Sequence, residues 1–68
     1  MTIREACNQI ILYNKTQRHK NPVQIHNMEY PYNNTYTLEA EEILQKASEA
    51  VLNMTCKAVI ENGVIVIN

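Results

Sequence analysis

The chain has 68 residues, with six Lys or Arg, seven Asp or Glu and a formal net charge of −1. This length allows a single domain, residues 1–68, and a domain of this size buries only about 60% of the surface that its unfolded chain exposes. The only two cysteines, Cys7 and Cys56, cannot build the disulfide framework of a small secreted protein. We therefore expect self-association, most simply a homodimer, to reinforce the fold.

The start of the chain is polar and carries Arg4 and Glu5, and no apolar run approaches the ~20 residues that span a bilayer. These features predict a cytoplasmic protein with neither a signal peptide nor a membrane span. The abundance of Asn and Ile is typical of AT-rich genes, so we expect the source to be a low-GC bacterium or one of its phages.

The first segment has the pattern of an amphipathic helix. Thr2 and Glu5 have the spacing of a capping box, which predicts a helix beginning at Ile3 and ending between Asn14 and Gln17. Its expected inner face consists of residues at helical spacing: Ile3, Cys7, Ile10, Ile11 and Asn14.

Residues 14–22 are polar and end in Pro22, which predicts a loop or a frayed helix end. The triplets 23–25 and 28–30 each consist of two apolar residues with one polar residue between them. His26-Asn27 separates the two triplets. This pattern predicts a short hairpin across residues 23–30, with a single extended strand as the alternative.

Residues 30–36 contain a proline, two adjacent asparagines and three tyrosines, which predicts a structured turn. Thr37 is the expected N-cap of a second helix, with Glu39, Glu41 and Glu42 near its positive end. The apolar residues that follow keep helical spacing, which predicts one continuous helix from about Leu38 to Met54, supported by a Glu42–Lys46 pair.

Asn62-Gly63 lies between the apolar segments 57–61 and 64–67 and predicts a second hairpin. A two-residue turn would pair Ile60 with Ile65 and Ala58 with Ile67 on the inner face. The opposite face would carry Lys57, Val59, Glu61, Val64 and Val66.

The element order predicts a small α+β domain with the order helix–hairpin–helix–hairpin (αββαββ), in which two helices pack on an antiparallel sheet in two layers. The face that carries Val59, Val64 and Val66, or an open edge at residues 64–67, is the expected contact of a homodimer. The alternative is that the tyrosine-rich loop of the same chain covers this part of the sheet.

Residue types that carry chemistry are sparse. Cys7, His19, His26 and Cys56 are suitable zinc ligands, but they lack the close pairing of structural zinc sites, so we expect buried cysteines and no metal. Ser48 has no base near it in the sequence, and the glutamates at 39–42 are explained by the start of a helix. With a single glycine there is no phosphate-binding loop. We expect no catalytic site and no cofactor, and hence a non-enzymatic accessory protein that binds an unknown protein partner.

The alternative is a nucleic-acid-binding regulator. Residues 1–28 carry four basic residues and one acidic one, with Lys15, Arg18 and Lys20 close together. These residues could contact phosphates while Tyr30, Tyr32 and Tyr36 stack on bases. The same three tyrosines could instead form a protein-binding patch or a small core under their loop. The net charge of −1 favours protein binding over nucleic-acid binding.

Overall fold

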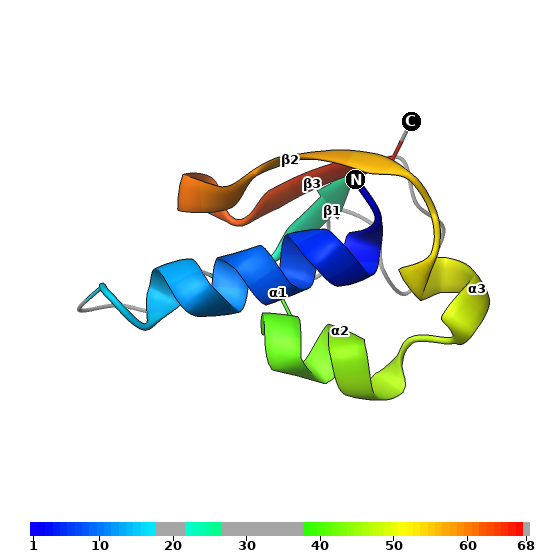
Figure 1. Ribbon diagram of the computed structural model, residues 1–68, viewed down its shortest axis with the longest axis horizontal. Helices are drawn as coiled ribbons and strands as arrows, with labels where there is room; N and C mark the ends of the chain where they lie inside the picture. Colours follow the sequence, from blue (N-terminus) through cyan, green and yellow to red (C-terminus); the bar gives the residue numbers. More distant parts are fainter. Residues whose placement is uncertain (18–21, 27–37, 68) are drawn as a thin grey trace.

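The structure, a computed structural model, describes residues 1–17, 22–26 and 38–67. The described elements are, in chain order, α1 (Ile3–Asn14), β1 (Gln24–His26), α2 (Ala40–Lys46), α3 (Glu49–Leu52), β2 (Cys56–Val59), the short 3₁₀ helix η1 (Ile60–Asn62) and β3 (Val64–Ile67). The chain is thus a small mixed fold of helix and sheet, and Figure 1 shows α1 running beneath the strands. In these described segments, no helix has the length and apolar character needed to cross a membrane.

The predicted start of α1 is confirmed. The Thr2 side chain accepts a hydrogen bond from the Glu5 N–H at 3.2 Å, and the Glu5 carboxylate accepts one from the Thr2 N–H at 2.8 Å. This reciprocal pair satisfies two N–H groups that a helix start leaves without helical partners. The helix ends at Asn14, and its buried residues are Ile3, Ala6, Cys7, Ile10 and Asn14.

The prediction of one helix from Leu38 to Met54 is wrong, because the helix is interrupted between α2 and α3. Ala47 and Ser48 adopt extended backbone conformations, with ψ of 147° and 161°. Ser48 is the N-cap of α3, and its side chain accepts a hydrogen bond from the Val51 N–H at 3.3 Å. The predicted cap at Thr37 lies outside the described residues, whereas the Glu42–Lys46 pair is confirmed at 3.6 Å.

The C-terminal hairpin is present, but its predicted register is wrong. Ala58 pairs with Ile65 and Cys56 with Ile67, a shift of two residues from the predicted partners. The shift arises because residues 60–62 form η1, and Gly63, at φ 69°, closes this turn by donating its N–H to the Ile60 carbonyl at 3.2 Å. Since side chains alternate with a period of two, a two-residue shift keeps the residues of β2 and β3 on their predicted faces. Ile60 and Glu61, which were also assigned to these faces, lie in η1 and not in the sheet.

The described strands form one sheet in the order β1–β3–β2. β3 is therefore the central strand, and the predicted open edge at residues 64–67 is wrong. β1 runs parallel to β3, with Ile25 opposite Ile65, so the sheet is mixed and not antiparallel as predicted. The second strand of the predicted first hairpin, residues 28–30, lies outside the described residues.

The core is built from residues of α1, α2, α3 and the three strands. Ile25 and Ile65 come from neighbouring strands and share the inner face of the sheet. The buried apolar residues are Ile3, Ala6, Cys7, Ile10, Val23, Ile25, Ala40, Ile43, Leu52, Cys56, Ile65 and Ile67. The opposite face of the sheet carries Val59, Val64 and Val66, three of the predicted interaction residues.

Candidate functional site

The face of the sheet opposite α1 carries two short rows of side chains across the three strands. The strand registers place Lys57, Val66 and His26 in one row. The other row consists of Val59, Val64 and Gln24. We call these six residues the outer sheet face. The structure thus brings together the predicted Val59, Val64 and Val66.

Exposure is uneven across the outer sheet face. Val59 is 47% exposed and is one of the few large hydrophobic residues in the described segments that reach the surface. Val64 and Val66 are half-buried, as is His26, while Lys57 and Gln24 are exposed. The face therefore has Val64 and Val66 at its centre and Val59 at one end, with polar side chains at the other ends. Such a mixture of apolar and polar side chains is found in protein–protein contacts.

The outer edge of β2 is partly covered by the first residues of the chain. The Cys56 N–H donates to the Met1 carbonyl at 2.7 Å, and the Ile3 N–H donates to the Met54 carbonyl at 3.0 Å. Because alternate residues of a strand direct their backbone groups to the same side, Ala58 directs its N–H and C=O outward as Cys56 does. Ala58 is therefore the one residue of β2 after Cys56 whose backbone groups point to this edge, so β2 offers a very short edge for pairing with another strand.

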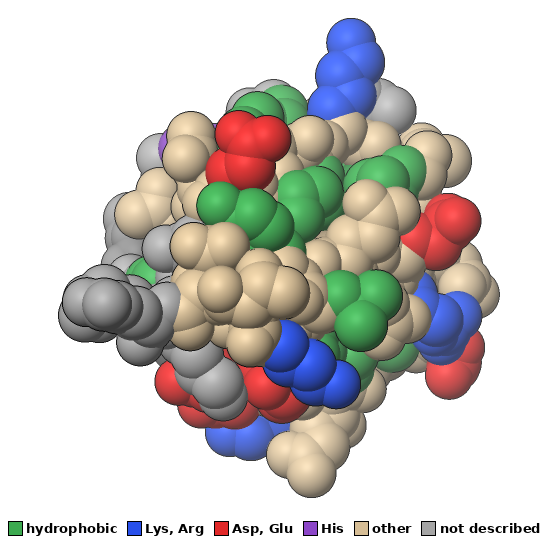
Figure 2. Space-filling model, turned by 60° about the vertical axis from the view of Figure 1, so that its left-hand side comes forward, with side chains coloured by type: hydrophobic (Ala, Val, Ile, Leu, Met, Phe, Trp, Pro, Cys, Tyr) green, Lys and Arg blue, Asp and Glu red, His purple; other side chains and the backbone are tan. Residues whose placement is uncertain are grey.

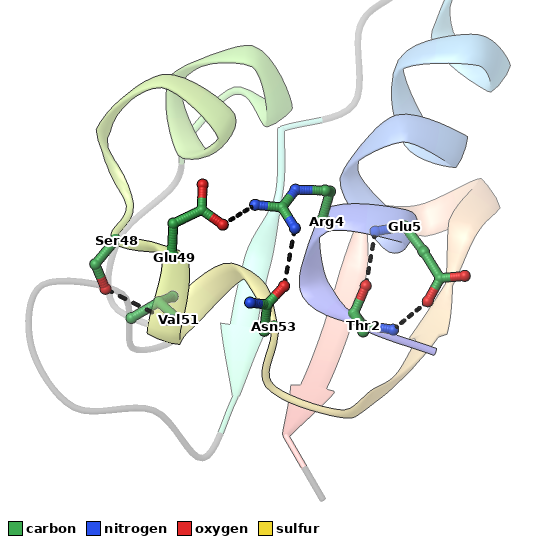
Figure 3. A network of polar contacts seen from close by, with 7 residues as sticks. All are labelled: Thr2, Arg4, Glu5, Ser48, Glu49, Val51 and Asn53. Atoms are coloured by element: carbon green, nitrogen blue, oxygen red, sulfur yellow. Dashed lines mark hydrogen bonds and ion pairs between the residues drawn. The ribbon is translucent and has the colours of Figure 1, made fainter.

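A polar network on the other side of the molecule joins α1 to α3 (Figure 3). The Arg4 guanidinium contacts the Glu49 carboxylate at 2.5 Å and donates to the Asn53 side-chain oxygen at 2.8 Å. Next to it, the hydrogen bond from the Thr2 N–H holds the pKa of Glu5 below its ordinary value of 4.5. This network was not predicted, and sequence spacing gives no signal for it because its partners are 45 and 49 positions apart.

Both cysteines belong to the core, as expected. Cys7 is fully buried on α1 and Cys56 is 3% exposed at the start of β2. Burial, with a smaller contribution from the nearby Cys56, raises the pKa of Cys7 to about 12. Burial also raises the pKa of Cys56. Protonated buried thiols of this kind are poor nucleophiles and poor metal ligands.

The residues considered for zinc do not form one cluster. His26 belongs to the outer sheet face, whereas Cys56 packs into the core on the other side of the same sheet. Within residues 1–17, 22–26 and 38–67, no group of three or more His, Cys, Asp or Glu side chains is arranged to hold a metal ion. His19 lies outside these segments.

The basic cluster and the tyrosine cluster lie almost entirely outside the described residues. Lys15 is exposed and follows the last residue of α1. The other predicted residues of these two clusters are not described: Arg18, Lys20, Tyr30, Tyr32 and Tyr36.

Exposed apolar side chains elsewhere are dispersed. Met1, Leu12 and Met54 are the other large hydrophobic residues exposed in the described segments. The side of the molecule drawn in Figure 2 shows small hydrophobic patches between polar and charged side chains. Single exposed apolar residues are normal on a protein surface, so the grouping of valines on adjacent strands is the more informative feature.

Comparison with known proteins adds no relative, since no family model, no curated protein and no solved structure matches this chain.

Proposed function

We propose that this chain is a small, non-enzymatic, cytoplasmic accessory protein that forms a homodimer and acts by binding another protein. In this proposal the domain has two layers, with its helices on one face of the sheet and the outer sheet face in the dimer contact. The observation that carries the proposal is the alignment of Val59 with Val64 on neighbouring strands, next to Val66, with Val59 47% exposed.

The outer sheet face suits a second copy because two such faces can pack apolar centre on apolar centre. Burying apolar surface gains about 25 cal/mol per Å², so exposed valines favour association. The contact of a two-fold dimer uses the same patch on both subunits. Lys57 and Gln24, at opposite ends of the two rows, would lie at the rim, where polar side chains keep contact with water.

Association through the face is favoured over association through an edge of β3 or β2. β3 has neighbours on both sides, and the Met1 carbonyl occupies the edge of β2 at Cys56. The remaining backbone groups of Ala58 would provide too few hydrogen bonds for a strand-to-strand dimer.

The test is size exclusion with light scattering in low-salt reducing buffer, applied to wild type, Val59→Lys and Leu12→Lys. Wild type should elute as a species of about 16 kDa, twice the chain mass of 7.9 kDa. Val59→Lys should dimerise more weakly than wild type because it places a charge in the contact. Leu12→Lys is the matched control, since Leu12 is 61% exposed and lies on α1, away from the outer sheet face.

Two results would overturn the proposal. One is a wild-type protein that stays near 7.9 kDa at the highest soluble concentration. The other is an equal loss of dimer in Leu12→Lys and Val59→Lys, which would place the contact elsewhere. A heavier peak with excess absorbance at 260 nm that nuclease removes would instead support the nucleic-acid-binding alternative.

A further inference from the structure

The bend between α2 and α3 occurs where the local sequence favours a continuous helix. Residues 40–52 contain neither Gly nor Pro, and Ala47 is the residue type with the highest helix propensity. Even so, Ala47 and Ser48 are extended, and α3 has only four residues. Contacts made elsewhere in the fold must therefore hold this bend.

A continuous helix would also gain backbone hydrogen bonds. The helical pattern of α2 ends with the Ala47 N–H, which donates to the Ile43 carbonyl at 2.9 Å. At the start of α3, Val51 donates its N–H to the Ser48 side chain and not to a helical carbonyl. If the two helices joined, the N–H groups of residues 48–51 would meet the carbonyls of residues 44–47.

The contacts that hold the bend join α1 to the chain that follows Ser48. Arg4 binds Glu49 and Asn53, and Leu52 is 4% exposed in the core. The first residues of the chain bond to Met54 and Cys56, and β1 pairs with β3. The Arg4 contacts, the backbone hydrogen bonds and the β1–β3 pairing each join residues 1–26 to residues 49–67, and none requires both partners to belong to the same chain.

We propose that two copies of this chain exchange residues 49–67, with Ala47 and Ser48 as the hinge. In the exchanged dimer α2 and α3 form one helix, and the exchanged segment makes with the partner the contacts that it makes here within one chain. Exchange of identical elements is a low-cost route to a dimer because it preserves the existing interface. This inference does not depend on the outer sheet face.

The first test compares Ser48→Ala with Ser48→Pro, both in a Val59→Lys background that weakens the proposed face contact. Both substitutions delete the Ser48 cap, but only alanine permits a continuous helix. Proline fits the φ of −70° at Ser48 and the extended Ala47 before it, and it blocks the helical bond to Leu44. After refolding at high concentration, Ser48→Ala should associate at least about tenfold more strongly than Ser48→Pro. Equal dimer fractions would overturn the exchange.

The second test uses the Arg4–Glu49 pair to distinguish exchange from any other dimer. Arg4→Glu and Glu49→Arg each bring like charges together within one chain. When the two variants are mixed in equal amounts and refolded, exchange restores two opposite-charge pairs, so the ratio of mixed dimer to either self-dimer should exceed the twofold ratio of random pairing by about threefold or more. The double variant Arg4→Glu/Glu49→Arg restores the pair within one chain and should behave as its parent. A ratio of mixed dimer to either self-dimer no higher than the twofold ratio of random pairing would refute exchange, whether or not the outer sheet face dimerises.

Discussion

Ile65 provides the sharpest test of the core. It is fully buried at the middle of the central strand, with Ala58 and Ile25 as its neighbours on the inner face. Truncation of such a residue to alanine removes apolar contacts and leaves a cavity, which costs about 2–5 kcal/mol. A domain of 68 residues has a total stability of about 3–10 kcal/mol, at roughly 0.05–0.15 kcal/mol per residue. Ile65→Ala should therefore leave a large fraction of the protein unfolded.

The milder variant Ile65→Val keeps the measurement within the folded range. Loss of one buried methylene should cost about 1 kcal/mol, which corresponds to a melting temperature lowered by about 4–8 °C. Thermal and urea unfolding followed by circular dichroism would measure both variants. Lys46→Ala is the control, because Lys46 is exposed and loses only its surface pair with Glu42. If Ile65→Ala unfolds no more easily than Lys46→Ala, the two faces of the sheet have been assigned the wrong way round.

Other predictions concern the helix cap, the turn and the thiols. Thr2→Ala should lower the free energy of unfolding by about 0.5–2 kcal/mol in urea titrations, and an unchanged midpoint would contradict the capping role. Gly63→Ala should lower the free energy of unfolding by about 1–2 kcal/mol in the same titrations, because Gly63 has a φ of 69° that alanine adopts poorly. Asn62→Ala, at the neighbouring position, is its control. The raised pKa of Cys7 keeps this thiol protonated in the folded state, whereas the unfolded thiol ionises above its ordinary value of 9.0. Stability should therefore fall by up to about 1.4 kcal/mol per pH unit between pH 9.0 and about 12, and this slope should be shallower in Cys7→Ala.

Features coded by neighbouring residues were predictable from the sequence. Thr2 and Glu5 are three positions apart, and their capping box forms as expected. Glu42 and Lys46 pair one helical turn apart. Gly63 marks the turn of the C-terminal hairpin, although η1 lengthens the connection and shifts the register. Side-chain alternation survives this shift, and for that reason Val59, Val64 and Val66 were correctly placed on one face.

Features that depend on distant residues were not predictable. The parallel pairing of β1 with β3 gives β3 a neighbour on each side and removes the edge that the sequence indicated for a dimer. It also adds Gln24 and His26 to the outer sheet face. Nothing in residues 23–26 indicates which strand they pair with or in which direction, because pairing is decided by the packing of the whole sheet.

At Ser48, the local sequence and the contacts with distant residues favour different backbone conformations. Local propensity and apolar spacing both favour a helix through residues 47 and 48, whereas the burial of Leu52 and the Arg4 contacts require the chain to turn there. Because helix propensities differ by well under 1 kcal/mol between most residues, burial of one leucine outweighs them. The Ser48 side chain partly replaces the helical hydrogen bonds that are lost at the interruption, because it accepts one from the Val51 N–H at the start of α3. Local propensity thus favours one conformation of residues 47 and 48 and the contacts of the fold favour another, and for this reason we propose them as the hinge of an exchange between copies.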